Sequence, residues 1–166
     1  METATCDALN ALREALCHEE EGLSFYRNAA ERTIDEKGAA MYAALAEEAE
    51  ARLAIIQRQI AALEAGGAWD LPECVLACQA NLEEPLYPRG EKGLQEAVDL
   101  YSNALNALEF GLQAANNSYA LYADHATHAA APQAKALYHY LAQEARNQFN
   151  LLMSNYESLN AHGGWV

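Results

Sequence analysis

The chain has few basic residues. Ten lysines and arginines stand against 24 aspartates and glutamates, which gives a formal net charge of −14 over 166 residues. Such an acidic surface repels phosphate backbones and anionic lipid headgroups. The sequence also lacks an uninterrupted apolar run of about 18 residues, the length that a membrane-spanning helix needs. We therefore expect neither nucleic acid nor a membrane among its partners.

Several chemical motifs are missing as well. No basic segment followed by an apolar stretch opens the sequence, so no secretory signal is predicted and a cytoplasmic location is expected. There is no glycine-rich phosphate loop and no nucleophile–base motif. The four cysteines lack the neighbouring ligand pair that a zinc site requires, and we interpret them as small buried residues. They are Cys6, Cys17, Cys74 and Cys78.

What the sequence does contain is an internal repeat. An offset of 96 residues aligns 7–69 with 103–165 without a gap, and 18 of the 63 aligned positions are identical. Tyr26 aligns with Tyr122, and Tyr42 aligns with Tyr138. An alanine-rich composition accounts for only a handful of such identities, so the alignment indicates a duplication.

Each copy predicts two helices, because apolar residues recur at intervals of three, four and seven residues. In the first copy we expect a helix that is capped by Asp7 and ends near Thr33. A second helix is expected from about Glu36 to Leu63, where Gly66 follows as a helix terminator.

The segment 70–102 separates the copies and contains helix-breaking prolines, with a short helix expected over 76–82 and the third helix beginning at its end. In the second copy, Pro132 suits the first turn of the fourth helix. Residues 1–166 are therefore expected to form one all-α domain. Its two antiparallel helical hairpins, 7–69 and 103–165, are joined by a long crossover.

Four segments carry a resemblance to a known family. They are EEEGLSFY at 19–26, YAALAEEAEARL at 42–53, LEAGGAW at 63–69 and EPLYPRG at 84–90. With them the chain resembles the rubrerythrin branch of the ferritin-like superfamily over nearly its whole length. The resemblance implies a ferritin-like four-helix bundle. A CxxC pair is absent from the sequence, so the rubredoxin-like domain of full rubrerythrins is not expected.

The family's di-iron ligands are mostly absent. The resemblance implies one Glu from each of the first and third helices, and a Glu-x-x-His motif from each of the second and fourth. Carried over residue by residue, these six positions are Glu19, Ala49, Arg52, Ala115, Ala145 and Gln148. Only the first is a ligand type, so we predict no metal ligand, no catalytic residue and no cofactor.

A shifted register does not restore the ligands. The repeat preserves Glu48 and Glu144, but no histidine follows either residue at a spacing of three or four. We interpret both as flanking, partly exposed residues. Di-iron held by rearranged ligands remains the alternative for the cofactor.

Arg52 stands at a position that the resemblance places inside the bundle. An unpaired buried guanidinium is very costly, so we expect an ion pair with Glu19. Gln148 and the hydroxyls of Tyr26 and Tyr122 would complete its hydrogen bonds. Alternatively, Arg52 extends outward and pairs with a surface acid such as Glu48.

Two other features concern partners. His125 and His128 lie three residues apart near the end of the third helix, where a solvated helix end is favoured over a metal site; His18, His139 and His162 have no evident partner. Between Tyr101 and Ala123 only Glu109 is charged, which is typical of an interface core. We expect a homodimer through the third helix.

The residues favour a non-enzymatic function, as a structural or binding module with a degenerate di-iron site. A di-iron oxidase, peroxidase or iron-handling protein is the alternative. A third hypothesis is a small-molecule binder that uses space left by Ala49, Ala115 and Ala145.

Overall fold

The structure is a computed structural model that describes residues 2–78 and 102–166, and all the regular secondary structure in this part of the chain is helical, without a strand. Its five helices are α1 (Glu2–Arg32), α2 (Glu36–Glu64), α3 (Glu73–Leu76), α4 (Ser102–His128) and α5 (Pro132–His162). Among these described helices, none is both long and apolar enough to cross a membrane. The all-helical class predicted from the periodicity is therefore confirmed.

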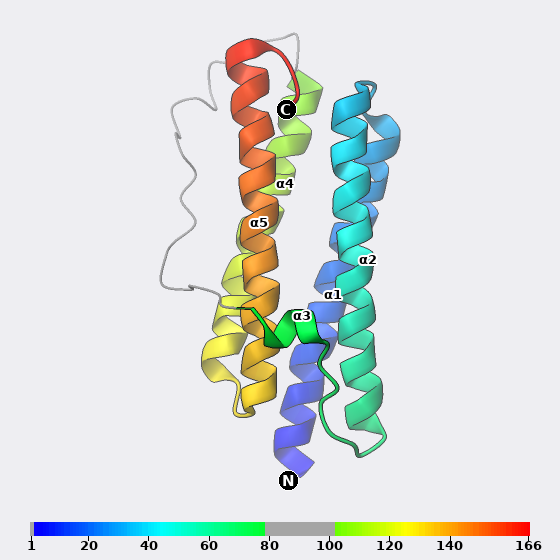
Figure 1. Ribbon diagram of the computed structural model, residues 1–166, viewed down its shortest axis with the longest axis vertical. Coiled ribbons are helices and arrows are strands. Elements are labelled where there is room, and N and C mark those ends of the chain that lie inside the picture. Colours follow the sequence, from blue (N-terminus) through cyan, green and yellow to red (C-terminus); the bar gives the residue numbers. More distant parts are fainter. Residues whose placement is uncertain (1, 79–101) are drawn as a thin grey trace.

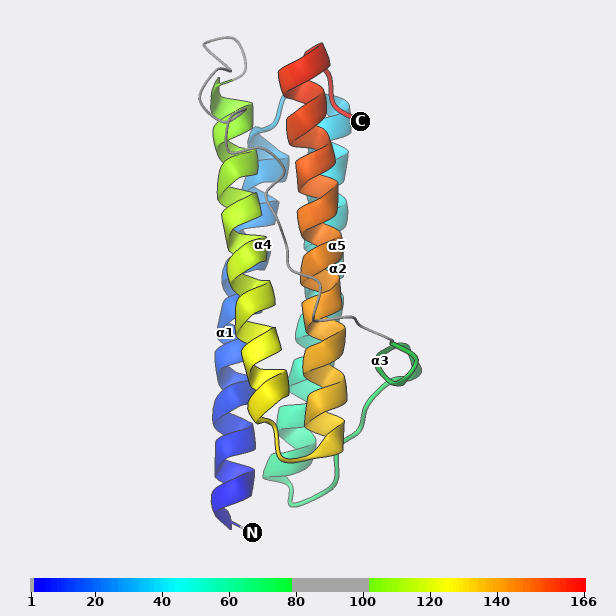
Figure 2. The same cartoon turned by 90° about the vertical axis from the view of Figure 1, so that its left-hand side faces the viewer.

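The four long helices lie side by side (Figure 1). α1 packs against α2 and α4 packs against α5, so each copy of the repeat forms an antiparallel hairpin. α2 ends at the end of the molecule opposite to the one where α4 begins, so these two helices run in the same direction (Figures 1 and 2). A direct tight turn could not connect them.

Local residues explain most helix ends. The side chain of Asp35 caps α2 by accepting hydrogen bonds from the backbone N–H groups of Lys37 and Gly38. Pro132 occupies the first turn of α5 as predicted. Gly66 and Gly163 adopt left-handed backbone angles just after α2 and α5, with φ of 75° and 69°.

Two predicted helix boundaries are wrong. Asp7 is not an N-cap, because α1 already begins at Glu2 and passes through it. No proline or glycine interrupts residues 2–6, and an acidic first residue suits the positive end of a helix. The short helix expected over 76–82 lies earlier, as α3, and Ala77 and Cys78 are not helical. Residues 79–82 lie outside the described part.

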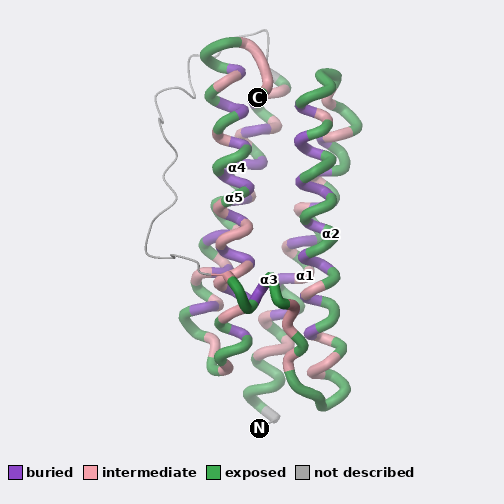
Figure 3. Tube along the Cα trace, viewed as in Figure 1, coloured by how far each residue is buried: buried purple, intermediate pink, exposed green. Residues whose placement is uncertain are grey.

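Buried residues recur along each of the four long helices (Figure 3). They form two apolar clusters, and each cluster draws on both hairpins. Tyr26 and Tyr42 belong to one cluster, whereas their repeat equivalents Tyr122 and Tyr138 belong to the other. The candidate site includes residues of both clusters.

The C-terminal segment, which follows the second hairpin, packs against the first hairpin. The ring of Trp165 meets Tyr42 edge to face, with 6.1 Å between ring centroids. Gly38 lies beneath this ring: a Cβ at this position would stand 2.7 Å from Trp165 Cε2 and 2.8 Å from Thr33 Cγ2. Glycine is therefore required here by close packing rather than by backbone conformation.

Gly38→Ala tests this contact. Although alanine favours a helix by about 1 kcal/mol, the clash should dominate and reduce the free energy of unfolding by about 1–2 kcal/mol in urea denaturation. Gly22→Ala is the matched control, because a Cβ at Gly22 meets nothing within 4 Å. The control should stabilise the protein. Equal stabilisation by both substitutions would contradict the packing of Trp165 on Gly38.

Candidate functional site

The six positions that the resemblance assigns to di-iron ligands are all buried. Glu19 and Arg52 have only 6% and 2% of their surface exposed, and Gln148 has 7%. The other three positions hold alanines with at most 1% exposure, namely Ala49, Ala115 and Ala145. The three polar side chains come from α1, α2 and α5, in an interior that also buries the polar residues Gln59 and Asn155.

Arg52 forms a buried ion pair with Glu19. Its Nε donates to Glu19 Oε2 at 3.0 Å. The other carboxylate oxygen, Oε1, accepts a hydrogen bond of 2.8 Å from Tyr122 Oη on α4. Both oxygens of Glu19 are thus engaged. The pair expected from the sequence is present, and the alternative in which Arg52 extends outward is wrong, since Arg52 is almost fully buried.

Gln148 accepts hydrogen bonds from the remaining nitrogens of the guanidinium. In the amide orientation that satisfies both neighbours, its Oε1 accepts from Arg52 Nη2 at 2.9 Å and from Nη1 at 3.2 Å. Its Nε2 then donates to Tyr26 Oη at 3.0 Å. All four long helices therefore contribute a hydrogen-bonding group to one network.

The electrostatics of the network favour the charged pair. Burial acts to lower the pKa of Arg52, but the attraction and the hydrogen bond of Glu19 outweigh it and leave this pKa raised. Burial, reinforced by the charge of Glu19, raises the pKa of Tyr122 well above its ordinary value. The tyrosine thus remains a neutral hydrogen-bond donor. Both oxygens of Glu19 and the guanidinium of Arg52 are therefore engaged in hydrogen bonds within the protein.

A second carboxylate approaches Arg52 from α5. Glu144 Oε2 lies 3.9 Å from Arg52 Nη1, and its side chain is 25% exposed. Burial raises the pKa of Glu144, and Arg52 opposes this rise. The repeat-equivalent residue Glu48 is exposed. Glu144 is thus partly exposed and Glu48 is exposed, and both lie beside the buried pair as the sequence predicts.

Two stacked pairs of tyrosines flank the network symmetrically. Tyr26 stacks on Tyr42 and Tyr122 stacks on Tyr138, with centroid distances of 6.5 and 6.4 Å. Tyr26 and Tyr122 face the ion pair and are hydrogen-bonded. Within the described residues, the buried hydroxyls of Tyr42 and Tyr138 have no hydrogen-bond partner. The aromatic part of the duplication has therefore stayed symmetric, whereas the charged part has not.

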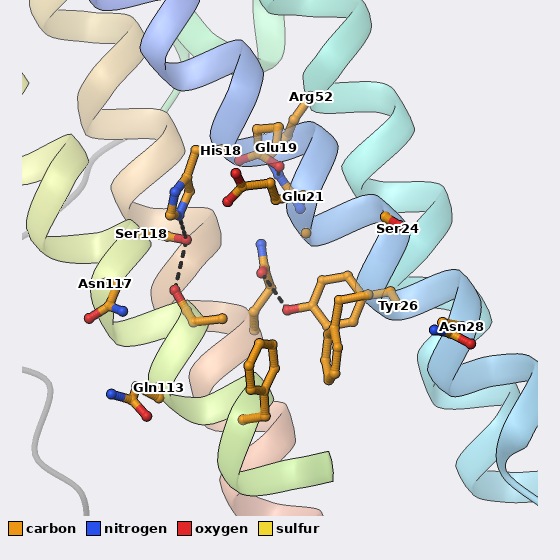
Figure 4. A pocket seen from close by; sticks show the side chains of 15 residues that line it. His18, Glu19, Glu21, Ser24, Tyr26, Asn28, Arg52, Gln113, Asn117 and Ser118 are labelled. Carbon is orange, nitrogen blue, oxygen red and sulfur yellow. Dashed lines mark hydrogen bonds and ion pairs between the residues drawn. The ribbon is translucent and has the colours of Figure 1, made fainter.

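A cavity of about 580 Å³ reaches this network between α1 and α4. Glu19, Tyr26, Arg52 and Gln148 belong to its lining (Figure 4). The three alanines proposed from the sequence to leave space do not line it. The cavity is therefore not the space that the sequence predicted.

Other residues differ from their sequence interpretation. Cys6, Cys17 and Cys74 are exposed free thiols and Cys78 is partly exposed, so the expectation of buried cysteines is wrong. They lie on outward faces, which their chemical type alone does not reveal. His18 has a partner that the sequence did not suggest, since its Nε2 lies 2.6 Å from Ser118 Oγ on α4.

The two histidines at the end of α4 point to separate partners. His125 Nε2 lies 3.1 Å from Glu14 Oε2 on α1, whereas His128 Nδ1 lies 2.9 Å from the Asp124 backbone oxygen. Over residues 2–78 and 102–166, no three His, Cys, Asp or Glu side chains are grouped so that they could hold a metal ion.

Arg52→Leu tests the importance of the buried pair. Losing the guanidinium leaves the carboxylate of Glu19 buried without its countercharge, which should reduce the free energy of unfolding by about 3–5 kcal/mol. Urea denaturation followed by circular dichroism measures this change. Arg13→Leu is the control, because Arg13 pairs with Glu64 on the exposed surface and its loss should have little effect. Similar small effects of both substitutions would show that the buried pair is dispensable.

Comparisons of this chain with known protein families, with curated proteins and with solved structures find no match. The interpretation of the site therefore stands on its residues and their geometry.

Proposed function

We propose that this chain is a rubrerythrin-related, ferritin-like bundle whose di-iron centre has been replaced by the Glu19–Arg52 ion pair. In this proposal it serves as a non-enzymatic structural or binding module. The observation that carries the proposal is the burial of all six ligand-equivalent positions in one layer, where Arg52 pairs with Glu19.

The connectivity of the helices supports a ferritin-like relationship. Each hairpin is antiparallel, and α2 and α4 run in the same direction (Figure 1). A ferritin-like bundle has this arrangement because one long crossover joins its second and third helices, whereas a simple up-and-down bundle has none.

The chemistry of the layer opposes iron binding. A di-iron site needs several carboxylates and imidazoles, and Glu19 alone remains of these ligand types. Arg52 carries a permanent positive charge, which repels a metal cation from the same space. Both oxygens of Glu19 are already hydrogen-bonded, so binding iron there would also strand the guanidinium.

A cytoplasmic setting is part of this proposal. Cys6, Cys17 and Cys74 are exposed and Cys78 is partly exposed. Thiols of this kind persist in a reducing compartment and tend to form disulfides in an oxidising one.

Ferrous loading under anaerobic conditions, followed by oxygenation and metal analysis, tests the proposal. We expect less than a tenth of an equivalent of tightly bound iron per chain and no absorption from an oxo-bridged centre. Two tightly bound irons per chain would instead support the alternative, a di-iron oxidase, peroxidase or iron-handling protein that displaces Arg52 and uses Glu19 with Glu48 and Glu144.

The positive control restores the missing ligands in the same chain. The variant combines Ala49→Glu, Arg52→His, Ala115→Glu, Ala145→Glu and Gln148→His. Under the proposed relationship, this variant should bind about two irons per chain if it folds as judged by circular dichroism. A folded variant that binds none would count against a ferritin-like ligand geometry.

We also propose a homodimer through α4. Its exposed face is uncharged over four turns and includes Asn106, Gln113, Asn117 and Ala120. Phe110 on the same face is 61% exposed. Two chains of net charge −14 repel one another, and an uncharged face with an aromatic residue allows the closest approach.

Light scattering after size exclusion tests the dimer. We expect a mass of about twice 18.1 kDa for the native chain and a monomer for Phe110→Glu, which places a charge in the interface. Ile34→Glu is the matched control, because Ile34 is 99% exposed outside α4 and its replacement should leave the dimer intact. A native monomer would contradict the proposal.

A further inference from the structure

The cavity between α1 and α4 has no part in the structural role of the ion pair. Its volume of about 580 Å³ lies within the range of sites that hold small molecules. Figure 4 shows the side chains around it: His18, Glu19, Glu21 and Tyr26 come from α1, whereas Gln113, Asn117 and Ser118 come from α4. Arg52 and Gln148 reach it from α2 and α5.

A hydrogen-bonded bridge joins the two helices beside the cavity. Ser118 Oγ donates to the Ala114 backbone oxygen at 2.9 Å. Since the hydroxyl has one proton, the contact of 2.6 Å between Ser118 Oγ and His18 Nε2 must use the histidine as the donor. The bridge fixes the separation of α1 and α4 where the cavity approaches the ion pair.

Small residues leave the space open. Gly22 on α1 and Ala114 on α4 both line the cavity. A Cβ added to Gly22 would meet no atom within 4 Å, so the helix backbone itself forms part of the wall. A larger side chain at this position would enter the cavity without a clash.

The charges of the lining select against an anion. Arg52 is neutralised by Glu19 and hydrogen-bonded to Gln148, so its positive charge is already compensated. Glu21 is exposed and forms no ion pair with any residue in the described part of the chain, where it accepts only from the Cys17 thiol. The net charge of the lining is therefore negative, in a chain that is strongly acidic overall.

Aromatic rings complete the recognition surface. Phe25 and Phe110 line the cavity and contact each other, with 4.8 Å between their centroids. Ring faces attract cations and pack against flat apolar groups. The amide side chains of Gln113 and Asn117 supply oxygen acceptors for N–H groups.

We propose that this cavity binds a small organic cation with a flat or apolar body, of the amidine or amine class. Its charged group pairs with Glu21 and its body packs against Phe25 and Phe110. The inference assigns a class of ligand to the proposed binding module. It rests on the proposed function because Arg52 and Glu19, rather than iron, then form the inner wall of the cavity.

Three probes of nearly equal shape test the charge selection. Benzamidine is a cation, benzamide is neutral and benzoate is an anion at pH 7. Isothermal titration calorimetry should give a Kd for benzamidine at least tenfold lower than for benzamide, with no detectable heat for benzoate. Equal affinities, tighter benzoate binding or no benzamidine binding at millimolar concentration would each overturn the inference.

Two variants locate the binding. Gly22→Leu should fill the cavity and weaken benzamidine binding at least tenfold, while its melting temperature stays the same or rises. Glu21→Gln should weaken benzamidine binding about three- to tenfold and leave benzamide unchanged. Glu47→Gln is the control for charge, because Glu47 is exposed on α2 and does not line the cavity. Unchanged affinity in Gly22→Leu would place the binding elsewhere and contradict the inference.

The outcome is separable from that of the proposed function. Iron binding would refute the replaced metal centre whatever the probes do, whereas absent benzamidine binding in an iron-free protein refutes the cavity inference alone. Phe110, Gln113 and Asn117 belong both to the cavity lining and to the face proposed for the dimer, so a dimer through α4 would partly cover the cavity. Light scattering at the titration concentration therefore records the oligomeric state in which each affinity is measured.

Discussion

The interior of this bundle depends on keeping one buried guanidinium neutralised and hydrogen-bonded. Arg52 is only 2% exposed, so its N–H groups need hydrogen-bond partners within the protein. Glu19 provides the countercharge, Tyr122 holds the second carboxylate oxygen, and Gln148 accepts from the far side of the guanidinium. Because these groups come from all four long helices, the network fixes the relative positions of the two hairpins.

The duplication explains why the network sits where it does. The repeat places Tyr26 and Tyr122 at equivalent positions on either side of the layer, and each stacks on an equivalent partner from the next helix. The charged groups break this symmetry, because Glu19 and Arg52 have Ala115 and Gln148 as their equivalents. The first hairpin therefore supplies both members of the buried ion pair, whereas the second supplies the hydroxyl of Tyr122, the amide of Gln148 and the more distant carboxylate of Glu144. The same asymmetry leaves the cavity between α1 and α4 with an acidic rim on one helix and amides on the other.

Much of this structure could be predicted from the sequence, because the relevant physics is local or obligatory. Helical periodicity and the repeat predicted the long helices, and the cost of an unpaired buried charge predicted the partner of Arg52. Asp7 and the cysteines were misjudged because a residue type indicates a preference, whereas the surrounding chain decides the helix start and the exposed face. The His18–Ser118 bridge and the cavity depend on the separation of α1 and α4, which no pattern within a single helix encodes.

The central claim is that Glu19 and Arg52 act as one unit in the place of a metal centre. A double-mutant cycle with Glu19→Leu, Arg52→Leu and the double variant measures this coupling most directly, through the four free energies of unfolding in urea. We predict a coupling of at least about 2 kcal/mol, with the double variant closer to the native protein than Arg52→Leu alone. Additive effects of the two substitutions would contradict the account.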